Sequence, residues 1–301
     1  MAMIRTFEEL ERTAKSKPSR KLALAMAEEA DALKAVLTAA EQGIVEPILV
    51  GNKQSITEIA EQQGLDLSPH RIEPAEGEEQ CAAKAVELVR EGEAAVLMKG
   101  RTPTAVIMRA ILNRHGGLRG PRVLSHVSII EVDRYPKLFL MSDPGINIAP
   151  DLKTKAAIIE NMVFVAQRLG IERPKVAVIA AVEKVNPTAM PVTADAALLS
   201  KMSERGQITG CVVDGPFALD NALSRKSCDT KGIQTEVGGD ADALLMPDIE
   251  AANIFYKTLA HLTDAKIAAL TIGANVPVVM SSRSDSDAIK YYSILGAVSI
   301  A

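Results

Sequence analysis

The stretch of residues 236–257 reads EVGGDADALLMPDIEAANIFYK and joins an apolar run, a tight turn and a helical pattern. The apolar run 243–246 predicts a buried strand that ends at Pro247 and Asp248, where the helical pattern begins at once. In open α/β sheets, ligands bind beyond the carboxyl ends of the strands. The turn is therefore a candidate binding position, and a strand–turn–helix unit with a solvated helix face is the alternative.

The expected helix after this turn has two distinct faces. Glu250, Asn253 and Lys257 are spaced three and seven positions apart, so they share one polar face. A neighbouring apolar face suited to packing is formed by Ile249, Ala252, Tyr256 and Leu259.

The same alternation of apolar runs and helical patterns extends over most of the chain. Strands are expected over 46–51, 94–98, 122–130, 175–182, 211–214, 243–246, 267–271 and 276–280. Helices are expected over about 21–42, 53–63, 79–92, 103–115, 152–169 with Asp151 as its cap, 194–204, 249–262 and 285–297. Strands separated by helices of this length indicate βαβ units and a mostly parallel sheet.

Length and composition agree with an α/β protein. A chain of 301 residues is too long for one small core and suits two domains or one large α/β domain. Aromatic residues make up only 3% and tryptophan is absent, so small and aliphatic side chains must fill the core, as in helices layered on a parallel sheet. The net charge of −4 provides no field for nucleic acid.

Targeting segments and metal motifs are not evident in the sequence. The charged N-terminus lacks the apolar core of a signal peptide, and the longest apolar run, 176–182, is far shorter than the ~20 residues that span a bilayer. Cys81, Cys211 and Cys228 lack metal-ligand spacing and are expected to be buried thiols. We therefore expect a cytoplasmic protein with no structural metal and no membrane partner.

Polar loops follow several of the expected strands, although the sequence contains no P-loop, no GxGxxG after a strand and no GxSxG. Residues 99–104 (KGRTPT) and 281–286 (SSRSDS) combine Ser or Thr with Lys or Arg. Hydroxyls, backbone N–H groups and a forked arginine are what a phosphate group requires. Arg109 and Arg283 are the candidate arginines, and a surface ion pair is the alternative role for each.

Several blocks of the sequence resemble the phosphate acetyl/butyryltransferase family. The blocks are SDPGINIAPDLKTKAAIIENMV, DAALLSKM, VVDGPFALDNALS, GGDADALLMPDIEAANIFYK and VPVVMSSRSDS, and the resemblance runs from EPILVG to the last helix. It implies two α/β domains flanking a cleft, with an architecture like that of isocitrate and isopropylmalate dehydrogenases. It also implies a first domain built from both chain ends, 1–130 plus 270–301, and a second domain over 131–269.

The resemblance further implies reversible transfer of an acyl group between coenzyme A and inorganic phosphate, directly within a ternary complex. Acyl-CoA and phosphate would be substrates, no cofactor would be needed, and the chain would form a homo-oligomer, a dimer or higher. The short length, without an extra N-terminal domain, and the wording SHVSIIEV and VDGPFALDNA favour the butyryl branch. Transfer of acetyl is the alternative.

Site residues are also implied by the resemblance. Ser282 would donate a hydrogen bond and Arg283 would bind phosphate at the reacting centre. The other substrate-binding positions would be Thr104, Arg109 and Ser125 around phosphate, with Asp214, Pro216, Asp248 and Asn253. The thiol of coenzyme A, with an ordinary pKa near ~8.5, needs a base in one direction.

Neither acid that follows the Ser-Arg pair falls at the family's offset for that base. We expect Asp287 to be the base and Asp285 to cap the last helix, where an acid is favoured.

Two rival functions remain on the same architecture. A metal-dependent hydroxy-acid dehydrogenase would need aspartates one helical turn apart. The helix after Asp248 has Glu250 and Asn253 instead. A non-enzymatic acyl-CoA sensor would have lost the chemistry, against which the intact SSR and KGRTPTAVIMR stretches argue.

Overall fold

The structure, a computed structural model, describes residues 3–301 and divides them into two compact units. Unit 1 comprises the described residues before Glu8 together with Val123–Lys266, and unit 2 comprises Glu8–Arg122 and Ile267–Ala301. The expected domains, 1–130 plus 270–301 and 131–269, differ from these units chiefly at the strand over 125–131 and at the chain start, which belong to unit 1.

Unit 2 contains a mostly parallel sheet with the strand order β3-β2-β1-β4-β11-β10. The strands are β1 (Arg20–Ala25), β2 (Val45–Gly51), β3 (Arg71–Pro74), β4 (Val96–Lys99), β10 (Lys266–Ile272) and β11 (Val278–Val279). Neighbours pair in parallel, except that β10 and β11 are antiparallel. The carboxyl ends of β1, β2, β4 and β11 therefore meet at one edge.

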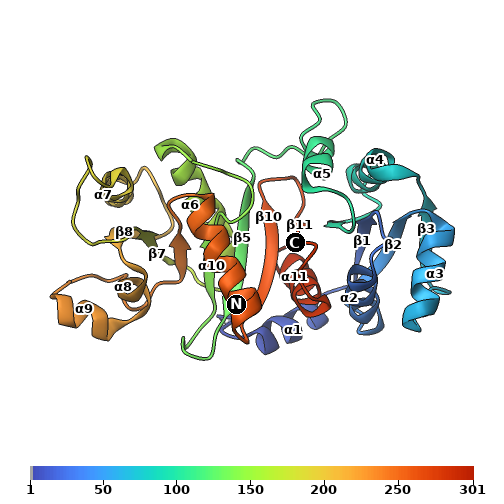
Figure 1. The fold of residues 1–301 in the computed structure, drawn as a ribbon, viewed down its shortest axis with the longest axis horizontal. Helices are drawn as coiled ribbons and strands as arrows, with labels where there is room; N and C mark the ends of the chain where they lie inside the picture. Colours follow the sequence, from blue (N-terminus) through green and yellow to red (C-terminus); the bar gives the residue numbers. More distant parts are fainter. Residues whose placement is uncertain (1–2) are drawn as a thin grey trace. The chain divides into compact units, whose positions relative to one another are not determined.

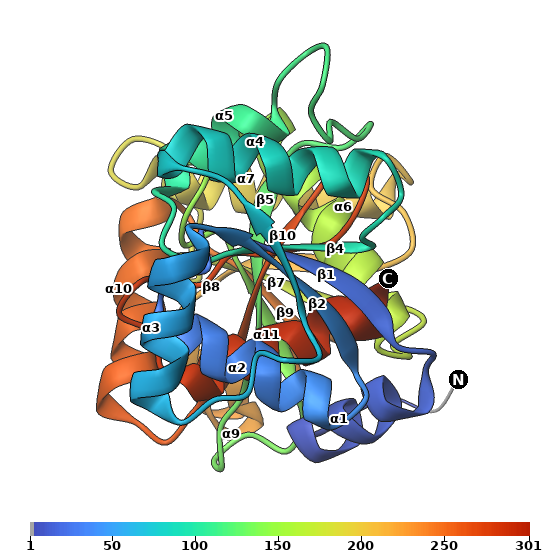
Figure 2. The same cartoon turned by 90° about the vertical axis from the view of Figure 1, so that its right-hand side faces the viewer.

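Helices cover both faces of the unit 2 sheet. They are α1 (Phe7–Ser16), α2 (Ala30–Glu41), α3 (Lys53–Gln63), α4 (Gly77–Arg90), α5 (Thr104–Ile111) and α11 (Asp287–Ile300). Figure 2 shows α4 and α5 on one side of the strands and α2 and α11 on the other, and each pair packs together. Helix α11 lies in the core, and every residue from Ser293 to Ile300 is buried.

The prediction of a helix over 21–42 is wrong in its first part, because β1 occupies Arg20–Ala25 and only α2 is helical. Leucine and alanine are strong helix formers, so RKLALA reads locally as helix. In the fold this segment lies between β2 and β4, and its last four residues are fully buried. Burial on both faces of a parallel sheet outweighs the local preference.

The strands of unit 1 have the order β5-β6-β9-β7-β8, and β5, β7 and β8 are labelled in Figure 1. The strands are β5 (Ser125–Glu131), β6 (Phe139–Ser142), β7 (Lys175–Ile179), β8 (Val212–Phe217) and β9 (Ala243–Leu245). The pair β5 and β6 is antiparallel and the other pairs are parallel. The prediction of a mostly parallel α/β arrangement is confirmed in both units.

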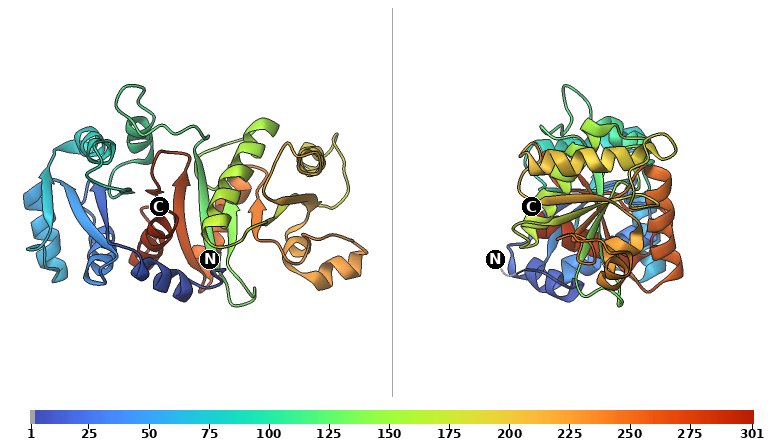
Figure 3. Two further views of the ribbon diagram at one scale, coloured as in Figure 1. Left: turned by 180° about the vertical axis from the view of Figure 1, so that it is seen from behind. Right: turned by 90° about the vertical axis from the view of Figure 1, so that its left-hand side faces the viewer.

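The helices of unit 1 are α6 (Leu152–Arg168), α7 (Pro191–Glu204), α8 (Leu219–Leu223), α9 (Arg225–Lys231) and α10 (Ile249–Leu262). Figure 3 shows α7 lying along β8, against which it packs. The predicted cap of α6 is confirmed, because the Asp151 side chain accepts a hydrogen bond from the Thr154 amide at 2.7 Å.

The strand, turn and helix predicted from residues 236–257 are confirmed. β9 ends at Leu245, and Asp248 is the N-cap of α10, where its carboxylate accepts from the Ala251 amide at 2.8 Å. Ala252, Tyr256 and Leu259 are buried, as the apolar spacing predicts.

Candidate functional site

Three predicted site residues lie at one edge of unit 2. β4 pairs in parallel with β1 on one side and with β11 on the other. The loop that leaves the carboxyl end of β4 leads to Thr104 at the start of α5, and the loop that leaves β11 carries Ser282 and Arg283. This is the edge of a parallel sheet where ligands bind.

The loop over residues 281–286, called here the serine–arginine loop, folds back on itself. The Ser282 amide donates to Asp285 Oδ2 at 2.7 Å, and the Asp285 amide donates to the Ser282 carbonyl at 3.2 Å. The hydroxyls of Ser282 and Ser284 lie 3.2 Å apart. These bonds leave the Ser282 side chain half-buried and the Arg283 guanidinium exposed, so that both can reach a bound molecule.

Helix α11 begins directly after the serine–arginine loop. Its N-cap is Ser286, whose hydroxyl accepts from the Ile289 amide at 3.3 Å. The expectation that Asp285 caps this helix is therefore wrong, because Asp285 precedes the cap, is 1% exposed and binds the Ser282 amide instead. The positive end of the helix dipole at the start of α11 favours a bound anion.

Asp287, the residue expected to be the base, is the first residue of α11 and pairs with Lys34 of α2 at 2.5 Å. The hydrogen bond from Lys34 lowers the pKa of Asp287, and partial burial opposes this without cancelling it. A carboxylate held ionised in this way accepts a proton less readily. The pairing favours a role at the helix end, and the base role of Asp287 stays a prediction.

A buried lysine fastens the serine–arginine loop to the start of α2. Lys290 of α11 is 1% exposed, and its ammonium donates to the Asp285 carbonyl at 2.5 Å. It also lies 3.1 Å from the Glu29 carboxylate, just before α2. A buried charge with such partners holds both segments in place, because leaving either partner alone would be costly.

The loop after β4 turns closely over the end of β1. The Gly100 amide donates to the Ala25 carbonyl at 2.9 Å, and a Cβ on Gly100 would lie 2.4 Å from the Met26 carbonyl oxygen. Only glycine fits this approach. Thr102 is buried and its hydroxyl lies 3.3 Å from the same Ala25 carbonyl.

Thr104 and Arg109 both lie on the exposed side of α5. Thr104 is the first residue of the helix, and Arg109 Nε donates to the Ala105 carbonyl at 3.3 Å. The opposite side of the helix buries Val106 and Ile107. Both predicted phosphate-binding side chains thus face solvent from one short helix.

Unit 1 brings Ser125 and Asp248 to one edge of its sheet. β5 is antiparallel to β6, so Ser125 at the start of β5 lies at the same edge as Ser142 at the end of β6. β9 runs parallel to β6 and leads to Asp248 at that edge.

A second polar loop, residues 142–147, leaves the same edge. Asp143 is buried and accepts hydrogen bonds from the amides of Gly145, Ile146 and Asn147 at 3.0, 3.0 and 3.2 Å. Asn253 of α10 donates from Nδ2 to the Pro144 carbonyl at 3.0 Å. Asn253, predicted to bind substrate, therefore holds α10 against this loop.

Ser125 is fully buried and bonds to a residue that sequence reasoning missed. Asn161 of α6 donates from Nδ2 to Ser125 Oγ at 2.9 Å and to the Val123 carbonyl at 2.7 Å. Beside Ser125, Nε2 of the buried His126 lies 3.2 Å from Ser128 Oγ. An asparagine in an amphipathic helix and a histidine in a strand give no sequence signal beyond their polarity.

Asp214 and Pro216 lie in β8, which is separated from β9 by β7. The Asp214 carboxylate accepts from the Thr235 hydroxyl at 2.6 Å. Asp214 lines a cavity of about 400 Å³ together with Arg173, Ser200, Cys211 and Glu236. The Gly215–Pro216 peptide is cis.

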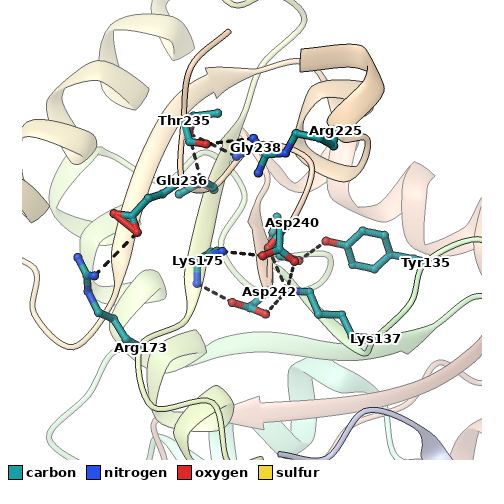
Figure 4. A network of polar contacts seen from close by, with 12 residues as sticks. Tyr135, Lys137, Arg173, Lys175, Arg225, Thr235, Glu236, Gly238, Asp240 and Asp242 are labelled. Carbon is teal, nitrogen blue, oxygen red and sulfur yellow. Dashed lines mark hydrogen bonds and ion pairs between the residues drawn. The ribbon is translucent and has the colours of Figure 1, made fainter. Parts of the chain in front are cut away.

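A network of charged side chains fixes the amino ends of β7 and β9, opposite the edge that carries Asp248 (Figure 4). The buried Lys137 lies 2.6 Å from Asp242 and 2.8 Å from Asp240. Lys175 lies 2.6 Å from Asp240, and its amide donates to Asp242 at 2.8 Å. Burial raises the pKa of Asp240, but hydrogen bonds from Lys137 and Lys175 outweigh it, so the pKa is lowered. We read this network as structural.

Other site types are limited by the described residues. Between residues 3 and 301, no group of three His, Cys, Asp or Glu side chains is arranged to hold a metal ion. Across the same part of the chain, no helix has the length and apolar character needed to cross a membrane. Cys81, Cys211 and Cys228 are free and buried, as predicted, and burial raises the pKa of Cys81 and of Cys211 to about 11.

Comparison with known proteins agrees with the resemblance seen in the sequence. The phosphate butyryltransferase of Clostridium acetobutylicum is 46% identical over 299 residues, which cover 99% of each chain. The phosphate acetyltransferase of Thermotoga maritima is 46% identical over 275 residues, 91% of this chain and 93% of its own.

Solved structures show the same fold. A branched-chain phosphotransacylase from Enterococcus faecalis superposes with a TM-score of 0.84 at 30% identity, over 93% of this chain and 98% of its own. A candidate 4-hydroxythreonine-4-phosphate dehydrogenase from Salmonella typhimurium superposes with a TM-score of 0.56 at 13% identity, over 94% of this chain and 100% of its own. The second likeness concerns the fold alone and confirms the predicted dehydrogenase-like architecture.

The family model described as "Phosphate acetyl/butaryl transferase" matches residues 5–84 and 78–298, nearly the whole chain. Both units and all the loops described above fall within the match. The chain therefore belongs to the phosphate acetyl/butyryltransferase family.

Proposed function

We propose that this chain transfers a short acyl group, preferentially butyryl, between coenzyme A and inorganic phosphate: butanoyl-CoA + phosphate = butanoyl phosphate + CoA. Family membership and the relatives described above support this proposal. The structural observation that carries it is the serine–arginine loop, which presents Ser282 and Arg283 beside the N-terminus of a 14-residue helix. A hydroxyl, a guanidinium and the positive end of a helix dipole together suit a phosphate-dependent acyl transfer.

In the proposed reaction, a phosphate oxygen attacks the thioester carbonyl carbon. A carbon–oxygen bond forms, the carbonyl oxygen takes up negative charge, and the carbon–sulfur bond then breaks with release of the coenzyme A thiolate. The Ser282 hydroxyl would donate to the developing oxyanion, where preorganised donors have their largest effect. Arg283 would hold phosphate in a planar fork. Because both substrates react directly, no acyl-enzyme is required.

Further substrate contacts are proposed for residues outside the serine–arginine loop. As the family resemblance implies, Thr104, Arg109 and Ser125 would contact phosphate, and Asp248 and Asn253 would be further substrate-binding positions. Asp214 and Pro216 stay predictions as substrate contacts, since the Asp214 side chain binds Thr235. We also propose a cytoplasmic location and a homo-oligomer of at least two copies, as the family resemblance implies.

The test is a spectrophotometric assay of thiol release from acyl-CoA esters with a thiol reagent. We expect release from butyryl-CoA to depend strictly on added phosphate, with no requirement for a nicotinamide cofactor. Acetyl-, propionyl-, butyryl- and isobutyryl-CoA on one sample would define the acyl preference. One methylene is worth only about 1–3 kcal/mol in an apolar pocket, so we expect rate ratios of about 10- to 200-fold. Thiol release without phosphate, or metal-dependent reduction of a nicotinamide cofactor, would contradict the proposal.

A further inference from the structure

Lys99 is a buried cation at the carboxyl end of β4 that the proposed mechanism does not use. It is 3% exposed, and its ammonium donates to the carbonyl of the adjacent Gly100 at 3.2 Å. By contrast, the buried Lys137 of unit 1 contacts two carboxylates. Burying an ammonium with one neutral acceptor is costly, so a further partner would be expected in the working protein.

A second polar group at the same edge is also unsatisfied. Ser281, the first residue of the serine–arginine loop, is buried, and its hydroxyl oxygen has no hydrogen-bond partner. β4 and β11 are parallel neighbours, with Met98 opposite Val279, so the chain places Lys99 at the end of β4 and Ser281 two residues after the end of β11. A buried cation and a buried hydroxyl donor thus lie beside the N-terminus of α11.

The charges around Lys99 come from each segment that meets at this edge. Glu29 precedes α2, Arg283 and Asp285 belong to the serine–arginine loop, and Lys290 belongs to α11. Glu29 already pairs with Lys290. Three cations face two carboxylates when Lys99 is protonated, which leaves an excess of positive charge for an anionic ligand.

We infer that Lys99 and Ser281 form part of the phosphate site, with the Lys99 ammonium as a further ligand of inorganic phosphate beside Arg283. This inference rests on the proposed function and names two residues that belong to the polar loops 99–104 and 281–286 but were not among the predicted site residues. Phosphate supplies the acceptor oxygens that Lys99 and Ser281 lack, and its charge compensates the buried cations.

The proposed contact has a consequence for pH. Burial lowers the pKa of Lys99; Glu29 and Asp285 raise it, and Arg283 and Lys290 lower it further, with a net lowering. Lys99 therefore loses its charge as the pH rises through this lowered pKa, at a pH where an exposed lysine stays charged. Bound phosphate favours the charged form, so phosphate affinity should fall as the pH rises through that range.

The test compares Lys99→Met and Lys99→Arg with Lys137→Met, which removes a buried lysine from the network in Figure 4. For Lys99→Met we expect the KM for phosphate to rise about 10- to 100-fold, the value of a lost bond to a charged group, with the KM for butyryl-CoA nearly unchanged. Its Tm should be unchanged or raised, since replacing a poorly paired buried charge by an apolar group relieves desolvation. Lys137→Met should lower the Tm and leave both KM values as they are.

The pH profile separates a ligand from a structural residue. In the wild type, the KM for phosphate should rise toward alkaline pH, above the second ionisation of phosphate. In Lys99→Arg this rise should disappear, because a guanidinium does not titrate there. Ser281→Ala should keep the Tm, as its hydroxyl has no protein partner to lose, and should raise the KM for phosphate.

A KM for phosphate that is unchanged in both Lys99→Met and Ser281→Ala would overturn the inference, while the wild-type activity would leave the proposed function standing. A rise confined to the KM for butyryl-CoA would also overturn it, because the phosphate groups of coenzyme A would then be the ligand. If Lys99→Met fails to fold, two other measurements replace it. One is the KM of Ser281→Ala for phosphate, and the other is the rise in Tm that phosphate causes in the wild type and in Lys99→Arg. A wild type without phosphate-dependent thiol release would refute the proposed function itself.

Discussion

At the scale of single residues, Arg283 carries the most direct prediction. Its guanidinium is exposed in the serine–arginine loop, and Asp287, one of its possible surface partners, pairs with Lys34 instead. Arg283→Lys keeps the charge but loses the fork, so it should keep the fold and lose transition-state stabilisation. We expect kcat to fall by about 10²- to 10³-fold, the cost of one preorganised donor. Steady-state kinetics with butyryl-CoA and phosphate measure this.

Arg283→Ala and a surface control complete the experiment. The alanine variant should be at least as slow, with the KM for phosphate raised more than that for butyryl-CoA. The exposed Arg205 at the end of α7 supplies the control Arg205→Lys, which should behave as wild type. Near-wild-type rates in both Arg283 variants would mean that this residue forms only surface contacts, which contribute about 0–1 kcal/mol.

The sequence marks the exposed residues of the serine–arginine loop as site candidates but does not mark the buried Lys99. Ser282 and Arg283 stand out because a Ser-rich turn with an arginine follows an apolar strand. Lys99 also ends an apolar run, in VLMKG, yet a lysine at a strand end is normally solvated, and only the fold shows it to be buried. The roles of Asp285 and Asp287 could not be assigned from the sequence. The backbone turn at Ser286 decides which of the two carboxylates faces the loop.

At the scale of elements, the sequence was sufficient to predict a helix or strand where a capping residue or a turn marked its end. Asp151 caps α6 as predicted, and Asp248 caps α10 in the same way, because a short side-chain acceptor at that position satisfies the first helix amides. β1 was missed because its Ala and Leu residues favour helix locally, and its identity as a strand comes from β2 and β4 on either side.

Helix α10 supplies the prediction at this scale. Asn253 fastens α10 to the loop over residues 142–147 through one hydrogen bond, to the Pro144 carbonyl. Asn253→Ala should cost only about 0.5–1.5 kcal/mol of stability, the value of one ordinary hydrogen bond. Because the loop would then be less well held beside Asp248, we expect slower butyryl-CoA turnover. Thermal melts and kinetics on the same sample measure both effects.

The matched control for Asn253 is Thr258→Ala on the same helix. The Thr258 side chain is exposed and donates only within α10, to the Ile254 carbonyl at 2.8 Å. It should therefore leave turnover unchanged. A large loss of stability in Asn253→Ala with unchanged specific activity would instead support the solvated-face alternative, in which α10 serves only packing.

At the scale of the whole molecule, the division into units was harder to predict than the α/β class. Alternating strands and helices are visible in the sequence, but no change in composition marks residues 122–123 or 266–267, where the chain passes between units. The expected boundaries came from a family resemblance and place β5 in the first domain, whereas β5 pairs with β6 and lies in unit 1. Pairing between strands distant in sequence decides such boundaries.

This division predicts that the first 122 residues cannot complete unit 2 without the end of the chain. Ending the chain after Lys266 removes β11 from its place beside β4 and removes α11, which packs on α2 and buries Ile294, Leu295 and Val298. Loss of so many buried aliphatic side chains, each worth about 1.5–3 kcal/mol, exceeds the usual stability of a domain. Hydrogen exchange should therefore show loss of protection in β1, β2 and β4 while β6, β7 and β9 stay protected. The full-length variant Ile294→Asp should weaken the same amides without shortening the chain, and undiminished protection of β1, β2 and β4 in the truncated protein would show that they form an independent core.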